Sequence, residues 1–172
     1  MSLLITLMAL GTVALNAALA LALLALFNSA WRTKLFALIR SNARLIFFLL
    51  SAASVAGTLF FEFAAGLAPC TFCWWQRIGM YPILFISAIA FLKNTDVSEI
   101  ADYILALSIF GGAFALYQHL LQVLPTGTII PCDASGDCAV RSIFEFGFVT
   151  IPWMALSVFA VFIFVALIAR KK

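Results

Sequence analysis

Charged residues are scarce in this chain. They make up 10% of its 172 residues, against about 25% in an ordinary soluble domain, while hydrophobic residues make up 66%. This composition excludes a soluble globular protein and indicates an integral membrane protein. The net charge of +3 comes from basic clusters beside the apolar runs, so it gives no reason to expect a nucleic-acid partner and suits an anionic membrane surface.

Long charge-poor runs divide the chain. A helix of about 20 apolar residues spans a bilayer, because each residue rises about 1.5 Å and lipid offers backbone polar groups no partner. No basic residue precedes the first run and no small-residue cleavage site ends it convincingly, so we expect a retained helix rather than a signal peptide. The prediction is an all-α, polytopic membrane protein with five spans, at residues 3–28, 45–65, 71–92, 101–124 and 151–169.

A basic segment, residues 29–44, separates the first two runs. It mixes aromatic and aliphatic side chains with four basic residues, which is typical of a short helix in the membrane interface; a solvated linker fits as well. If this segment is cytoplasmic, alternation places eight of the ten basic residues inside and leaves only Arg77 and Arg141 outside. We therefore predict an outside N-terminus and a cytoplasmic C-terminus.

The same topology places all four cysteines on the outer side. Cys70 and Cys73 lie between the second and third runs, and Cys132 and Cys138 lie in a loop over roughly residues 125–150. Disulfides persist outside the cytosol, so two closely spaced pairs there indicate redox-active cysteines. Spacing alone leaves three connectivities open.

The first pair is expected at the start of a helix. Pro69 suits that position, because its missing N–H costs nothing there, so Cys70 and Cys73 should occupy the first turn of the third span. Free N–H groups and the helix dipole then favour thiolate. Arg77 follows Cys73 by four residues, so it lies on the same face and adds a permanent positive charge. An arginine inside a membrane is costly, and we expect this one to be functional.

Several strings in order carry a specific resemblance. CTFCWWQRIGMYP, YQHLLQVLP, CDASGDC and FGFVTIPWMALSVF, over roughly residues 45–170, resemble the DsbB/BdbC family of membrane thiol:quinone oxidoreductases, and the short loop spacing resembles its BdbC-like branch. The resemblance implies a four-helix bundle in the bacterial cytoplasmic membrane. It also implies that electrons pass from an extracytoplasmic, DsbA-like thioredoxin-fold thiol oxidase to a membrane quinone, ubiquinone or menaquinone.

The resemblance gives each cysteine a role. It makes Cys70 and Cys73 the pair next to the quinone, with Cys73 forming the thiolate complex. It makes Cys132 the cysteine that forms a mixed disulfide with the partner oxidase, and Cys138 the one that exchanges with Cys70. All four are thus expected to be catalytic.

Further residues are candidates for quinone binding. Arg77 matches the family's arginine near the quinone headgroup, and His119 matches a histidine in its YxH segment. A hydrogen-bonded interfacial role for His119 is an equal alternative. Trp74 adjoins the second cysteine at headgroup depth, where anchoring in the interface is the simpler interpretation. Glu62 is expected to reach headgroups or a bundle partner rather than to handle protons.

Residues 1–30 lie outside the four-helix bundle that the resemblance implies. We expect an additional transmembrane helix that packs laterally, with a dimer or partner contact as the alternative, then a basic juxtamembrane segment at 31–44 and the DsbB-like bundle at 45–172. Competing interpretations are a vitamin-K-epoxide-reductase-like quinone reductase, a zinc site built from the four cysteines, and a non-catalytic or transport protein. The strings WWQR and GFVTIP favour the DsbB/BdbC type, and a compact zinc-domain pattern is missing, so we expect no metal.

Overall fold

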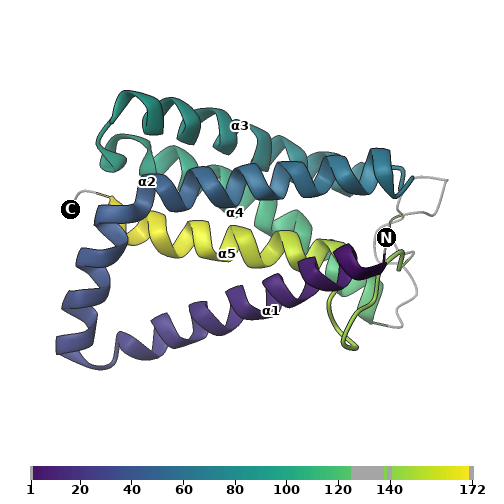
Figure 1. Ribbon diagram of the computed structural model, residues 1–172, viewed down its shortest axis with the longest axis horizontal. Helices are drawn as coiled ribbons and strands as arrows, with labels where there is room; N and C mark the ends of the chain where they lie inside the picture. Colours follow the sequence, from purple (N-terminus) through teal and green to yellow (C-terminus); the bar gives the residue numbers. More distant parts are fainter. Residues whose placement is uncertain (1, 125–137, 139–140, 171–172) are drawn as a thin grey trace.

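The structure is a computed structural model that describes residues 2–124, 138 and 141–170. Five helices in this part of the chain are long and apolar enough to cross a membrane, so the all-α, polytopic fold predicted from the charge-poor runs is confirmed. Figure 1 shows their arrangement. The elements are α1 (Ser2–Ala25), α2 (Ser29–Leu59), the π-helical turn η1 (Phe60–Ala64), α3 (Thr71–Lys93), α4 (Val97–Val123) and α5 (Ile151–Ala169).

The basic segment 29–44 forms the first part of α2, which continues without a break into the second span. Asn28 starts this helix, because its side chain accepts hydrogen bonds from the backbone N–H groups of Ala30 (3.0 Å) and Trp31 (3.4 Å). In Figure 1 this first part crosses the end of the bundle at a steep angle before α2 turns along the bundle. The segment is therefore helical, as the interfacial alternative required, and not an irregular linker.

Helices α2 to α5 form the four-helix bundle. Helix α4 packs against α3 and α5, and α2 packs against the same two helices from the other side, while α1 lies against α5 and α2. Large apolar side chains that are fully buried fill the centre, among them Phe47, Ile83, Ile104, Phe159 and Phe162. Burial of such side chains is worth about 1.5–3 kcal/mol each in water, but in lipid close packing matters more than burial.

Two glycines set the spacing of α3, α4 and α5. A Cβ added to Gly79 would lie only 3.1 Å from the Cα of Gly111, and a Cβ added to Gly111 would run into the ring of Phe159. Small residues at such a contact let helix backbones approach closely in a membrane. A larger residue at position 111 would therefore push α4 away from α5, and one at position 79 would push α3 away from α4.

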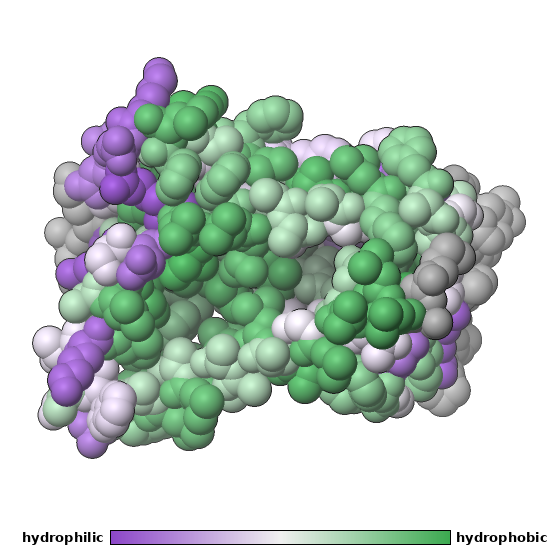
Figure 2. All heavy atoms as spheres, in the orientation of Figure 1, coloured by the Kyte–Doolittle hydropathy of each residue, from purple (hydrophilic) through white to green (hydrophobic). Residues whose placement is uncertain are grey.

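The two ends of the bundle differ. One end holds the N-terminus of α1, the connection from η1 to α3 and the start of α5, and the other holds the α1–α2 and α3–α4 connections. At this second end Arg40 donates from Nε to the carbonyl of Ile168 (3.0 Å), and Arg44 donates to the side chain of Asn94 (3.2 Å). Figure 2 shows hydrophilic residues gathered there. Basic side chains thus bond helix ends at the end of the bundle opposite the start of α3.

Candidate functional site

The first cysteine pair lies where α3 begins. Cys70 is the N-cap residue, with an extended backbone (φ −77°, ψ 172°), and Cys73 lies in the first turn. Pro69 therefore precedes the N-cap instead of standing in the first turn, as the sequence had suggested, and Thr71 is the first helical residue. The two sulfur atoms are 3.0 Å apart, which is a hydrogen bond between reduced cysteines and too long for a disulfide.

This contact controls the charge of the pair. The hydrogen bond from the Cys73 side chain is the main reason that the pKa of Cys70 is lowered, from 9.0 to about 5. Burial opposes the shift, whereas the backbone of Cys73 and the side chain of Cys138 add to it through further hydrogen bonds. A lowered pKa means that the charged form is favoured. The hydrogen bond from Cys73 therefore favours the charged form of Cys70.

Gln118 connects the three described cysteines. This side chain is 2% exposed and donates to the sulfur atoms of Cys70 (3.1 Å) and Cys73 (3.8 Å) and to the backbone carbonyl of Cys138 (3.4 Å). Its own carbonyl accepts a hydrogen bond from Gln76 at 2.6 Å. Because an N–H donor stabilises a negatively charged acceptor, this amide favours thiolate at the start of α3.

Cys138 is the loop cysteine that the structure brings to this site. It is 3% exposed, and its side chain bonds to Cys70. Gln122 also donates to its carbonyl (3.3 Å), and Arg141 donates from Nε to the carbonyl of Gln122. One loop cysteine is thus in contact with the CxxC pair, although Cys132 lies outside the described residues.

Two cavities flank the CxxC pair. The larger, about 360 Å³, lies between α1, α2, α3 and α5, and its lining is apolar apart from a few hydroxyl groups and the side chains of Cys73, Gln76 and Arg77. The smaller, about 70 Å³, is lined by Cys70, Cys73, Gln118 and the chain that leads into α5. Cys73 borders both cavities and Cys70 only the smaller one. The pair therefore separates an apolar chamber from the side on which Cys138 lies.

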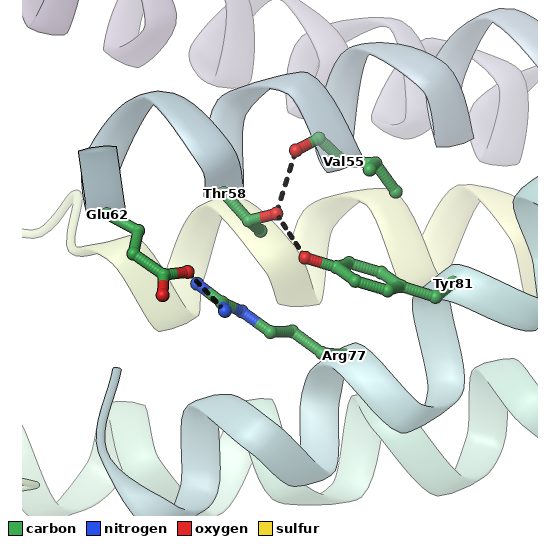
Figure 3. Close-up of polar contacts among 5 residues, drawn as sticks. All are labelled: Val55, Thr58, Glu62, Arg77 and Tyr81. Atoms are coloured by element: carbon green, nitrogen blue, oxygen red, sulfur yellow. Dashed lines mark hydrogen bonds and ion pairs between the residues drawn. The ribbon is translucent and has the colours of Figure 1, made fainter. Parts of the chain in front are cut away.

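Arg77 is buried and its charge is paired. Its Nη1 atom lies 2.6 Å from Oε2 of Glu62, and its guanidinium carbon lies 5.1 Å from the centre of the Trp74 ring. Figure 3 shows the arginine and the glutamate reaching toward each other from α3 and from the end of α2. Glu62 belongs to η1, whose wider turn is closed by the N–H of Ala65 bonding to the carbonyl of Phe60 (3.0 Å). Glu62 was expected to reach either lipid headgroups or a partner in the bundle, and in the structure it pairs with Arg77 of the bundle.

His119 and Trp74 do not line either cavity. Nδ1 of His119 lies 2.9 Å from Oγ1 of Thr150, and its ring packs on Trp153 at a centroid distance of 4.8 Å. Since Thr150 caps α5, this contact ties α4 to the start of α5. Trp74 is 52% exposed and covers Arg77 from outside. Both sets of contacts fit the interfacial alternatives, and quinone binding by these two residues stays a prediction.

Sequence reasoning missed Gln76, Gln118 and Gln122. All three are buried polar side chains inside apolar helices. Such residues are costly in a membrane unless they find an internal partner, so their position in the spans was the available signal. In contrast, within residues 2–124, 138 and 141–170 no three His, Cys, Asp or Glu side chains are grouped so that they could hold a metal ion.

Comparison with known proteins places the chain among disulfide-forming proteins. The family model "Disulfide bond formation protein DsbB" matches residues 40–169. "Probable disulfide formation protein C" of Halalkalibacterium halodurans is 40% identical over 121 residues, which are 69% of this chain and 87% of that protein. "Disulfide bond formation protein C" of Bacillus subtilis is 34% identical over 121 residues, 69% of this chain and 86% of that protein. "Probable disulfide formation protein" of Metapseudomonas resinovorans is 33% identical over 133 residues, 76% and 91% of the two chains. No solved structure matches the chain.

Proposed function

The chain belongs to the DsbB family of disulfide bond formation proteins, and from this membership and the site we propose that it reoxidises a DsbA-like thiol oxidase and delivers the electrons to a membrane quinone. As a member of this family it is a membrane oxidoreductase that generates disulfides. The observation that carries the proposal is the position of the CxxC pair, with Cys138 on one side and the large apolar cavity on the other. The comparisons give no support to a vitamin-K-epoxide-reductase-like or a transport protein.

The large cavity has the chemistry that a quinone headgroup needs. Its volume of about 360 Å³ lies within the usual range of ligand pockets, about 300–1,000 Å³. Gln76 and Arg77 supply N–H donors for carbonyl oxygens, and the remaining lining suits an apolar ring and an isoprenoid tail. Cys73 is the redox-active side chain that borders this space. When bound, a quinone accepts two electrons and two protons, and the cysteine pair is left as a disulfide.

The residues around the cavity bind, orient and exclude water. Arg77 offers a charge-assisted hydrogen bond, which is stronger in an apolar cavity than in water. Glu62 holds the guanidinium in place at 2.6 Å and offsets its charge. The carbonyl of Gln118 accepts a hydrogen bond from Gln76, and its N–H group donates to the cysteine sulfur atoms. The cavity wall therefore presents fixed donors beside the sulfur that must give up electrons.

On the other side, the loop cysteines exchange with the partner. A partner thiolate attacks Cys132 of a Cys132–Cys138 disulfide, which forms a mixed disulfide and releases Cys138 as a thiolate. The partner's second thiolate then displaces Cys132, so that the partner leaves oxidised and the loop pair is reduced.

The electrons then move from the loop pair to the CxxC pair. The thiolate of Cys138 attacks Cys70 of the oxidised pair and releases Cys73, and Cys132 next attacks Cys138 and releases Cys70. The contact between the Cys138 and Cys70 side chains supports this order. A leaving thiol of low pKa departs faster, so the lowered pKa of Cys70 favours the last displacement.

We also propose that the cysteine end of the bundle faces outward. The partner acts on disulfides, which persist outside the cytosol. Arg40 and Arg44 lie at the opposite end, where the positive-inside rule favours the cytoplasm.

Purification in mild detergent followed by lipid extraction tests the proposal. The wild-type chain should carry quinone or bind an added short-chain quinone, and should reduce it when supplied with the reduced partner. Cys73→Ser is the matched control, since it should keep quinone binding and lose quinone reduction. A wild-type chain that binds no quinone and still reoxidises the partner would overturn the assignment of the electron acceptor.

A further inference from the structure

Helix α1 lies outside the family match, which begins at residue 40, yet it lines the cavity that contains Cys73. Met8, Gly11, Thr12 and Leu15 face that cavity. Their spacing of three and four positions makes them one stripe along the helix. We infer that α1 is a wall of the quinone site and that this stripe helps to set the affinity for quinone. The inference rests on the proposed function.

Helix α1 meets the bundle near its N-terminus. A Cβ added to Gly57 would lie 2.9 Å from Cε of Met8, so α1 and α2 are in direct contact there. Ala9 and Thr12, the buried residues of α1, belong to the same half of the helix. Toward Ala25 the helix diverges from the bundle, and Figure 2 shows gaps between this half and the neighbouring helices. The cavity is therefore walled by α1 at the cysteine end of the bundle.

The walls of the cavity differ in chemistry. Gln76 and Arg77 project from α3, whereas the stripe on α1 has a single hydroxyl group, that of Thr12. This hydroxyl donates to the carbonyl of Met8 at 2.9 Å, so its donor is used within α1. One wall thus offers donors and the other an apolar surface. The ligand class that matches both is a planar ring with carbonyl oxygens at its edge and a long apolar tail, which is a prenylated quinone.

An acyl chain of a bilayer lipid is the other apolar occupant that α1 would admit. It would fill the space along α1 but would offer no acceptor to the further N–H groups of Gln76 and Arg77, beyond those that donate to Gln118 and Glu62. The geometry therefore favours the quinone, and quinone binding itself is the quantity to measure.

Gly11→Phe tests the wall. A Cβ at Gly11 would meet no atom within 4 Å, so the new ring has room to enter the space beside α1. Because it takes up volume that the ligand needs, the Kd for an added short-chain quinone should rise by about tenfold or more, and less quinone should remain on the purified chain. Leu10→Phe is the matched control: it adds a ring to the same helix at a residue that is 49% exposed and does not line the cavity. Its Kd should stay within about twofold of the wild type.

Photolabelling of the wild-type chain with an azidoquinone covers the case in which Gly11→Phe disturbs packing. Adducts are expected on residues 8–15 as well as on α3. The inference is overturned if Gly11→Phe binds quinone as tightly as Leu10→Phe, or if the adducts are confined to α2–α5. If the wild-type chain neither binds quinone nor is labelled by the azidoquinone, the proposed function itself is refuted. The two failures can therefore be told apart.

Discussion

Replacing Gln118 with leucine removes a side chain that donates to both sulfur atoms of the CxxC pair. The bond to Cys70 is 3.1 Å long, and Gln118 is only 2% exposed, so water has little access to replace the lost donor. Leucine fills a similar volume without an N–H group. The change removes the donor to both sulfur atoms, together with the bond to the Cys138 carbonyl and the one accepted from Gln76.

The expected size of the effect follows from the charge of the acceptor. A hydrogen bond to a charged group contributes about 1.5–3 kcal/mol, and one pKa unit corresponds to about 1.4 kcal/mol, so the pKa of Cys70 should rise by about 1–2 units. The sign is upward because the amide stabilises the charged form, and its loss favours the thiol. The side chain of Cys138 also lowers this pKa, so the variant has to be compared with a parent that lacks Cys138 as well. The thiolate fraction should then fall strongly below neutral pH and change little in alkaline solution.

Alkylation of the reduced chain by iodoacetamide, followed from acidic to alkaline pH, measures this pKa through the thiolate. Parent and variant should both carry serine at positions 132 and 138, so that only the CxxC pair reacts. Gln122→Leu is the control, because Gln122 is also a buried amide on α4 and, like Gln118, donates to the Cys138 carbonyl. An identical pKa for Cys70 in Gln118→Leu and in its parent would refute the role assigned to Gln118.

Three more outcomes are expected. A cysteine introduced at Ser2, in a chain without the native cysteines, should react with an impermeant maleimide in intact cells, and protection there would reverse the proposed orientation. In Cys138→Ser the Cys132 thiolate can attack the disulfide of the oxidised partner, and no loop thiol is left to resolve the mixed disulfide, which should accumulate; Cys132→Ser should not accumulate it, and equal accumulation on a gel would contradict the role of Cys132 as the entry point. Arg77→Met should raise the KM for a soluble quinone by about tenfold or more while thiol exchange with the partner continues, since it removes a charged donor from the cavity alone. An unchanged KM would leave Arg77 as a structural residue.

The spans were predictable because lipid leaves the backbone no alternative to the helix. The bounds of α5 were predicted to the residue, since the apolar run and the helix both end before Arg170. The start of α2 was not predicted. An interfacial helix and a spanning helix satisfy their backbone hydrogen bonds in the same way and differ only in direction, so the sequence did not show where one passes into the other. The contact of α1 with the cavity was also hidden: α1 is apolar on every side, so no polar face showed which residues turn inward.

The site was predictable where its chemistry is local. The CxxC spacing and Arg77, four residues beyond Cys73, can be read from one stretch of sequence. The partners of Gln118 and Arg77 cannot, because they come from other helices, 48 and 15 residues away in the chain. His119 shows the opposite case, in which a reactive residue type stood out in the sequence but its ring bonds to the cap of α5.

The ion pair of Arg77 changes what removal of its charge should do to stability. A lone buried arginine would destabilise the fold, and its replacement by methionine would relieve that cost. With Glu62 at 2.6 Å, Arg77→Met instead leaves a partly buried carboxylate, 26% exposed, without its cation, and breaking such a pair is worse than deleting both members. The double variant Arg77→Met with Glu62→Gln should therefore melt at a higher temperature in detergent than Arg77→Met alone. Its KM for quinone should stay raised, because the donor is missing in both variants. Recovery of stability without recovery of binding would mean that Glu62 holds the arginine and the arginine holds the ligand.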